Sequence, residues 1–180
     1  MSKLPTIVII GRRNVGKSAL FNRLIEEDKA IVSDIAGTTR DRTEGVCLWR
    51  GKKLRVVDTG GLDIGEVDLI DREVARQAKF AIKEADIILF MVDARVGPQP
   101  SEGKVAKELR QLTTPNPSSE RRGNHPISSP ARGEVRRGGR DIPIILIANK
   151  AETARLRDAA QDPTWKRLGF DIPFPISAIT

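Results

Sequence analysis

Residues 6–25 read TIVIIGRRNVGKSALFNRLI, and this stretch decides the fold. Its first part, 6–10, is a continuous apolar run that predicts a buried parallel strand. Its last part carries apolar residues at helical spacing, namely Leu20, Phe21, Leu24 and Ile25. Between the two, residues 11–18 match the phosphate-binding pattern G-x-x-x-x-G-K-S in the position the pattern requires, after a strand and before a helix. The stretch therefore predicts strand, phosphate-binding loop and helix.

Each fixed residue of this loop has a chemical reason. The two glycines allow backbone N–H groups to surround phosphates, and the helix N-terminus adds a favourable dipole. Lys17 is expected to reach the β- and γ-phosphates and Ser18 to ligate Mg²⁺ through its hydroxyl. The candidate nucleotide-binding residues of this segment are Gly11, Arg12, Arg13, Asn14, Val15, Gly16, Lys17, Ser18 and Ala19.

The rest of the chain alternates between strand-like and helical patterns. The expected strands are residues 43–50, 53–58, 87–92, 142–148 and 172–176, and the expected helices are residues 71–85, a helix starting at Ser101, and 153–160. Gly51-Lys52 separates the first two of these strands and predicts an antiparallel hairpin. We therefore expect an α/β fold of the P-loop NTPase class, a three-layer sandwich with a mostly parallel sheet and one antiparallel edge strand.

Length and composition fit one domain over residues 1–180. No apolar run approaches the ~20 residues of a membrane-spanning helix, and the N-terminus lacks the pattern of a secretory signal, so we expect a cytoplasmic protein. Residues 113–140 are rich in proline, glycine and serine and predict a disordered basic insertion. No helix follows residues 172–176, so we expect the domain to be truncated before its last helix.

The formal net charge of +7 is concentrated in one segment. Residues 113–140 hold six arginines and two glutamates, and so contribute most of the excess. Such a segment could touch RNA phosphates, although a solvated insertion without a partner is the preferred interpretation. The chain has one histidine, His125, which excludes a site built from several histidines.

Three further clusters follow predicted strands. Asp58-Thr59-Gly60-Gly61 is suited to Mg²⁺ binding by Asp58 and to a backbone contact from Gly61 to the γ-phosphate. Asn149, Lys150 and Glu152 follow a later strand, where an amide and a carboxylate could read the edge of guanine, which offers a carboxylate two donors. The remaining cluster is Ser177 and Ala178, expected to add a backbone contact to the base.

These motifs resemble the Ras-like superfamily of GTPases, and most closely the first G domain of the EngA/Der (double-Era) ribosome-assembly GTPases. The resemblance covers residues 3–112 and 141–180. The Era-like and the MnmE/TrmE-like tRNA-modification GTPases share much of it. It is carried by the loop and helix from Gly11, Gly-Thr-Thr-Arg-Asp-Arg from Gly37, Asp-Thr-Gly-Gly from Asp58, Asp93-Ala94-Arg95 and Asn149-Lys150.

The resemblance implies further roles. Thr39, with Thr38 as the less favoured alternative, would close on Mg²⁺ and the γ-phosphate, and residues 28–42 and 59–70 would be the two switches. Leu62 stands where Ras-like enzymes place a water-orienting glutamine, and relatives with an apolar residue there use the loop asparagine, here Asn14, to hold K⁺. Glu152 departs from the family's Asn-Lys-x-Asp by one methylene, which leaves the strength of guanine pairing open. The catalytic set implied is Lys17, Thr39, Gly61 and Asn14; the metal ligands are Ser18, Thr39 and Asp58 for Mg²⁺ and Asn14 for K⁺.

Three functions remain as hypotheses. The first is a K⁺-stimulated GTPase switch, monomeric or weakly associating, that acts in large ribosomal subunit assembly with a ribosomal or rRNA partner. The second is a guanine-nucleotide-binding module with little or no turnover, and a third is an RNA-binding protein that uses the arginine-rich segment. Turnover with and without K⁺ would separate the first two, and deletion of that segment would test the third.

Overall fold

The computed structural model describes residues 3–26, 43–59, 82–113 and 141–179, and within them the chain forms a six-stranded sheet in the order β2-β3-β1-β4-β5-β6. All neighbouring strands are parallel except β2 and β3, which form an antiparallel hairpin at one edge. The prediction of a mostly parallel α/β sheet with one antiparallel edge strand is confirmed. The strands are β1 (Thr6–Gly11), β2 (Thr43–Trp49), β3 (Lys52–Asp58), β4 (Ile87–Asp93), β5 (Ile144–Asn149) and β6 (Phe174–Pro175).

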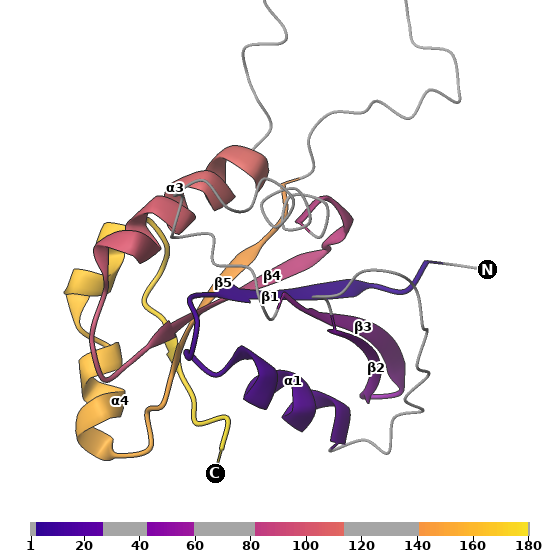
Figure 1. Ribbon diagram of the computed structural model, residues 1–180, viewed down its shortest axis with the longest axis horizontal. Helices are drawn as coiled ribbons and strands as arrows, with labels where there is room; N and C mark the ends of the chain where they lie inside the picture. Colours follow the sequence, from indigo (N-terminus) through magenta and orange to yellow (C-terminus); the bar gives the residue numbers. More distant parts are fainter. Residues whose placement is uncertain (1–2, 27–42, 60–81, 114–140, 180) are drawn as a thin grey trace, which may run out of the picture.

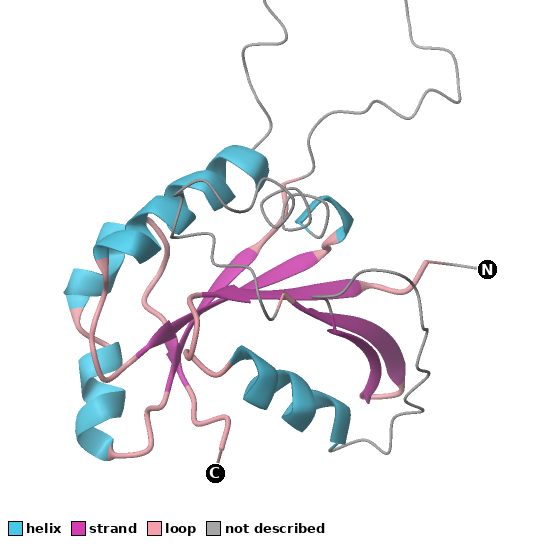
Figure 2. Ribbon diagram, in the orientation of Figure 1, coloured by secondary structure: helices cyan, strands magenta, loops and turns pink. Residues whose placement is uncertain are grey.

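Helices lie on both faces of this sheet, as Figures 1 and 2 show. On one face is α1 (Lys17–Glu26), and on the other are α3 (Pro100–Thr113), α4 (Ala154–Ala160) and the 3₁₀ helix η2 (Pro163–Leu168). Because side chains alternate along a strand, each central strand supplies both faces with apolar residues. The result is the three-layer sandwich expected from the sequence.

The two faces form two separate hydrophobic clusters. In β1, Val8 belongs to the cluster beneath α3, whereas Ile9 belongs to the cluster beneath α1. In β4, Phe90 and Met91 are divided in the same way. All four side chains have no exposed surface, and burial of each contributes about 1.5–3 kcal/mol to folding. Strand β1 is therefore anchored on both faces, and it leads directly into residues 11–18.

The edge hairpin differs from the predicted one by one residue. The turn is formed by Arg50 (φ 48°) and Gly51 (φ 76°), and Lys52 already belongs to β3. A two-residue hairpin turn of this kind requires positive φ at both central residues, which glycine adopts without strain and arginine adopts at a cost. The hairpin is confirmed, but its turn consists of residues 50 and 51, one residue closer to the N-terminus than the predicted residues 51 and 52.

The last strand is shorter than the predicted range 172–176. Only Phe174 and Pro175 pair with β5, and the N–H of Ile176 continues the contact by donating to Ala148 O at 2.9 Å. Proline lacks the N–H that a longer ladder needs, and Pro173 and Pro175 both fall in this segment.

Two other predicted segments lie largely outside the described residues. Of the helix expected over 71–85, residues 82–85 are described, and of these 82–84 are helical. Of the insertion expected over 113–140, only Thr113 is described, and it is the buried last residue of α3. No helix among the described residues combines the length and apolarity that crossing a membrane requires.

The 3₁₀ helix η2 was not predicted. It begins with Pro163 after the capping residue Asp162, whose carboxylate accepts from Thr164 N. Its Trp165 is 1% exposed, and the indole N–H donates to Ala159 O at 3.0 Å. This tryptophan fills the α3 face of the core near the end of the described chain.

Candidate nucleotide-binding site

The phosphate-binding motif forms the connection between β1 and α1, at the carboxyl end of the central strand. Space is very restricted here. A Cβ added at Gly11 would lie 2.5 Å from Met91 O, and one at Gly16 would lie 2.2 Å from Asn149 Nδ2. Gly16 also has φ 98°, which L side chains rarely adopt. Both glycines of the motif are therefore required by the space around them.

Lys17 lies inside the loop. Its side chain is buried, and Nζ donates to the carbonyl oxygens of Gly11 at 2.9 Å and Arg12 at 3.0 Å. The loop thus folds over its own ammonium group and concentrates positive charge where its backbone turns. This geometry suits a phosphate, because the charge and the backbone N–H groups of the helix start act at one place.

Ser18 and Asp58 provide oxygen atoms suited to a divalent cation. Ser18 Oγ donates to Asp58 Oδ2 at 2.8 Å, which joins the start of α1 to the end of β3. The other carboxylate oxygen, Asp58 Oδ1, is buried and has no hydrogen-bond partner. An unpartnered buried carboxylate oxygen beside a hydroxyl fits Mg²⁺, which prefers a few protein oxygens together with phosphate oxygens. Among the described residues there is no cluster of three or more His, Cys, Asp or Glu.

The other loop residues differ in their surroundings. Asn14 has φ 61°, a left-handed conformation that asparagine tolerates better than most residues, and it is exposed. Val15 is fully buried in the α1 cluster and so anchors the loop from below. Arg13 is exposed, and Ala19 is the third residue of α1.

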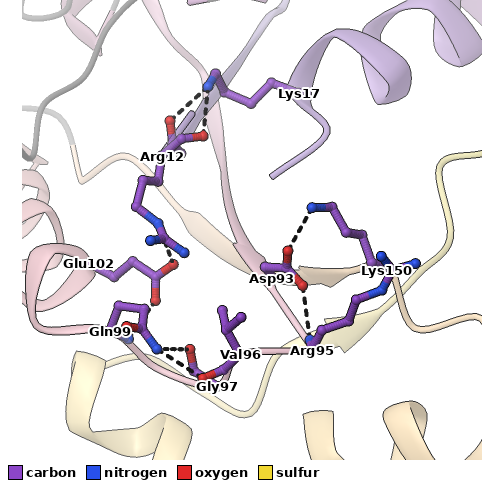
Figure 3. Close-up of polar contacts among 10 residues, drawn as sticks. Arg12, Lys17, Asp93, Arg95, Val96, Gly97, Gln99, Glu102 and Lys150 are labelled. Atoms are coloured by element: carbon purple, nitrogen blue, oxygen red, sulfur yellow. Dashed lines mark hydrogen bonds and ion pairs between the residues drawn. The ribbon is translucent and has the colours of Figure 1, made fainter. Parts of the chain in front are cut away.

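The side chain of Arg12 points away from Lys17. Figure 3 shows it extending to the start of α3, where Arg12 Nε lies 3.8 Å from Glu102 Oε1. Glu102 is 1% exposed, and its Oε2 accepts from Gln99 N at 2.8 Å. Sequence analysis did not single out Glu102. A glutamate in the first turn of a predicted helix is common, and its position beneath the phosphate loop follows only from the tertiary fold.

Asn149 joins the phosphate loop to the end of the sheet. Its Nδ2 donates to Val15 O at 2.8 Å, and its Oδ1 accepts from Ala178 N at 3.0 Å. The side chain is 1% exposed. These two bonds join Asn149 to the phosphate loop and to Ala178, and the expectation that its amide reads the base edge stays a prediction.

Lys150 and Glu152 lie at the surface next to Asn149. Lys150, with φ 65°, donates from Nζ to Asp93 Oδ2 at 2.7 Å. Asp93 Oδ1 accepts from Arg95 N at 2.9 Å, and the Arg95 guanidinium donates to Glu152 Oε1 at 3.1 Å. The carboxylate expected to read guanine is thus held by a neighbouring arginine (Figure 3 shows Asp93, Arg95 and Lys150). Arg95 was noted only as part of the resemblance.

The structure brings together the candidates of the phosphate loop, Asp58, residues 149–152 and residues 177–178 along the carboxyl ends of the strands. Thr39, Gly61 and Leu62 lie outside the described residues, as do both expected switch segments except Thr59. Thr59 is buried and donates from Oγ1 to Ile9 O at 2.7 Å, which fixes the end of β3 against β1.

Comparison with known sequences gives a consistent result. Residues 6–120 match a family model described as 50S ribosome-binding GTPase. The chain is 40% identical over 172 residues to GTPase Der of Amoebophilus asiaticus, covering 96% of this chain and 33% of that protein. It is 49% identical over 109 residues to GTPase Der of Flavobacterium johnsoniae, covering 61% and 25% respectively. The chain thus spans about a third of the length of such relatives, or less.

Solved structures agree on the fold. Era in complex with MgGDPNP and a fragment of 16S ribosomal RNA superimposes with a TM-score of 0.60 at 24% identity, covering 99% of this chain and 52% of that chain. The G domain of the T. maritima FeoB iron transporter superimposes with a TM-score of 0.57 at 21% identity, covering 98% and 89%.

Proposed function

This chain belongs to the 50S ribosome-binding GTPase family, and from that premise we propose that it binds GTP with Mg²⁺ and hydrolyses it as a molecular switch. The observation that carries the proposal is the phosphate loop itself. A buried Lys17 and the Ser18–Asp58 pair lie at one end of the central strand, with an unpartnered Asp58 oxygen beside the hydroxyl.

Different residues of the site would bind the phosphates and the Mg²⁺ ion. Gly11, Gly16 and the start of α1 present backbone N–H groups to the phosphates, and Lys17 supplies the charge. Ser18 and Asp58 would hold Mg²⁺, which on binding offsets the negative charge of the β- and γ-phosphates. Holding the ion would redirect the Ser18 hydroxyl from Asp58 Oδ2, where it now donates.

We assign the base end to Glu152, Lys150, Ser177 and Ala178, with Asn149 as the residue that holds them against the phosphate loop. A carboxylate can accept from both the N1–H and the exocyclic amine of guanine, whereas adenine offers no such pair. The additional methylene of Glu152 is compatible with this role because Arg95 fixes one of its oxygens at 3.1 Å.

Turnover requires groups besides those that bind the phosphates and Mg²⁺. Thr39 and Gly61 are proposed to close on the γ-phosphate. Asn14 is proposed to hold K⁺ where an arginine of a partner would otherwise place its charge. The exposed position of Asn14 at the turn of the loop is compatible with that role.

The partner we propose is the large ribosomal subunit or its RNA. Support comes from the family description and from the relatives named GTPase Der, of which this chain spans about a third. We also propose that the protein is cytoplasmic and is monomeric or only weakly associating.

Calorimetric titration of the whole chain with GDP, GTP and ATP in the presence of Mg²⁺ tests nucleotide binding. We expect guanine-selective binding that Lys17→Ala weakens by at least about 100-fold, since charge-assisted bonds to phosphate are lost. Lys166→Ala, which removes an exposed lysine from η2, is the matched control and should bind as the original chain does. No binding of any nucleotide by the original chain would overturn the proposal.

Phosphate release in KCl and in NaCl then tests the K⁺ assignment. Asn14→Gly retains the positive φ of this position but removes the amide. We expect faster turnover in KCl for the original chain and equal, slow turnover in both salts for the variant. Equal rates in the original chain would overturn the K⁺ assignment and leave the GTPase proposal intact.

A further inference from the structure

The contact between the phosphate loop and α3 joins two buried polar atoms that lack other partners. Arg12 Nε and Glu102 Oε1 face one another at 3.8 Å, and neither makes a hydrogen bond. Glu102 is 1% exposed, although glutamate is rarely fully buried unless it is paired. A small cavity beside them is lined by Gly11, Arg12, Phe90, Ser101, Glu102 and Val105.

Glu102 also organises the start of α3. Its Oε2 accepts from Gln99 N at 2.8 Å, and its own N–H donates to Gln99 O at 3.0 Å. The first bond is the glutamate half of a capping box, in which a glutamate at the third helical position accepts from the N–H of the capping residue, and the second is a backbone bond of the first helical turn. The helix therefore fixes the carboxylate, and the carboxylate in turn faces the loop.

The opposite end of the contact leads to the proposed phosphate site. The backbone carbonyl of Arg12 accepts from Lys17 Nζ at 3.0 Å, while the side chain extends away to Glu102 (Figure 3). Any movement of Arg12 therefore changes an acceptor of the buried ammonium group. A guanidinium placed in this way is poorly suited to contact a phosphate itself, because it lies on the far side of its own backbone.

We propose that Glu102 is a positioning residue for the phosphate loop, acting through Arg12, and that Arg12 links the loop to α3 and is not itself a phosphate ligand. The inference rests on the proposed nucleotide binding for its functional readout, but the link can also be measured without nucleotide. Burial, the largest cause, raises the pKa of the Glu102 carboxyl, as does nearby Asp93, while the bond from Gln99 N and the charge of Arg12 lower it, so Arg12 offsets part of the cost of burying the carboxylate.

If Arg12 were instead a phosphate ligand, substitution of Glu102 would change the affinity for GDP in the opposite direction. If Arg12 were a phosphate ligand restrained by Glu102, then Glu102→Gln would free its charge and tighten GDP binding. If Glu102 positions the loop, the same substitution weakens binding, because the loop loses its attachment to α3. Glu102→Gln is nearly isosteric and retains an acceptor for Gln99 N, so helix capping is preserved.

The experiment is a double-substitution cycle on the whole chain with Glu102→Gln, Arg12→Met and the combination, the methionine retaining the apolar length of the arginine stem. Dissociation of a fluorescent GDP is measured. We expect each single variant to release GDP about tenfold faster, the size expected for loss of one partly buried charge pair, and the double variant no faster than either. Glu108→Gln, on the same helix, is the matched control and should leave the rate unchanged.

Hydrogen exchange of residues 11–18 in the nucleotide-free chain is the second readout. Faster exchange in both single variants, with no further increase in the double variant, would support the link even if nucleotide binding failed. Additive effects on GDP release, tighter GDP binding by Glu102→Gln, or unchanged exchange in the loop would each overturn it.

Discussion

The phosphate end and the base end of the proposed site are held in different ways. The phosphate end depends on buried, closely packed groups. Lys17 is 5% exposed, and a Cβ added at Gly16 would lie 2.2 Å from Asn149 Nδ2. The base end depends on ion pairs that reach the surface, where the Arg95 side chain is 54% exposed. Buried, sterically closed contacts tolerate little change, whereas exposed ion pairs contribute about 0–1 kcal/mol and tolerate substitution. This contrast explains how the chain can carry Glu152 in place of aspartate while its phosphate loop matches the motif at every fixed position.

The strongest test of this contrast is Gly16→Ala. A Cβ there meets Asn149 Nδ2 and also requires φ 98°, so we expect loss of about 3 kcal/mol or more in the free energy of unfolding, from strain and displacement of a buried network. Urea denaturation measures it. Gly51→Ala, at φ 76° in open space, separates strain from the clash and should cost about 1–2 kcal/mol. Gly103→Ala, in a helix with open space, should be neutral or stabilising, and a similar loss in all three would contradict the contrast.

Asn149→Ala should have the next largest effect. It leaves Val15 O and Ala178 N without their side-chain partner in a buried setting, which costs about 2–4 kcal/mol for two unsatisfied groups. The free energy of unfolding, measured by urea denaturation, and the affinity for GDP should fall together, because the same side chain joins both ends of the site. A variant that loses GDP binding but retains full stability would show that Asn149 contacts the base directly and does not act by positioning.

Glu152→Gln should change specificity with little effect on stability. The amide replaces an acceptor by a donor opposite the guanine donors, so we expect about tenfold weaker GDP binding and unchanged ADP binding. Because the carboxylate is only partly buried and its arginine partner is exposed, the free energy of unfolding should change by about 0.5 kcal/mol or less. Asp158→Asn, an exposed acid on α4, serves as control. Equal weakening of GDP and ADP would remove Glu152 from base recognition.

The smallest expected effect concerns pH and belongs to the phosphate end. Burial raises the pKa of Glu102 above its ordinary value of 4.5, so the folded chain binds this proton more tightly than the unfolded chain. Stability from this group is present below the unfolded pKa and is lost as pH rises through the folded pKa. From pH 7 towards pH 4.5, the original chain should therefore gain stability relative to Glu102→Gln, as measured by urea denaturation at each pH. A constant difference across this range would show that the group is not perturbed.

Much of the fold could be predicted because its signals are local. The continuous apolar run of β1 and the helical spacing of α1 are set by neighbouring residues, and the glycine pattern between them is a recognisable local motif. What sequence reasoning missed depends on contacts between distant segments. Trp165 is a core residue only because η2 packs against the α3 face, and its proline-led turn lacks helical periodicity.

The candidate site followed the same rule. Ser18 and Asp58 were each assigned to Mg²⁺ from a separate motif, and the structure places Ser18 Oγ 2.8 Å from Asp58 Oδ2. Asn149 was assigned to the base because its amide chemistry suits a purine, but its two buried partners come from residues 134 positions before and 29 positions after it. Glu102 belongs to no motif, and only the packing of α3 against the loop brings it to Arg12.

The position of β1 has a kinetic consequence. It pairs on both sides, with β3 and β4, whereas β2 and β6 lie at the edges of the sheet. Edge strands can open by local fluctuations, but we expect most amide protons of a doubly paired, largely buried strand to exchange only when the domain unfolds as a whole. A ligand bound by the loop at the end of β1 thus contacts a part of the sheet that resists local unfolding. Its occupancy should slow global unfolding while the edges continue to fluctuate at their own rates.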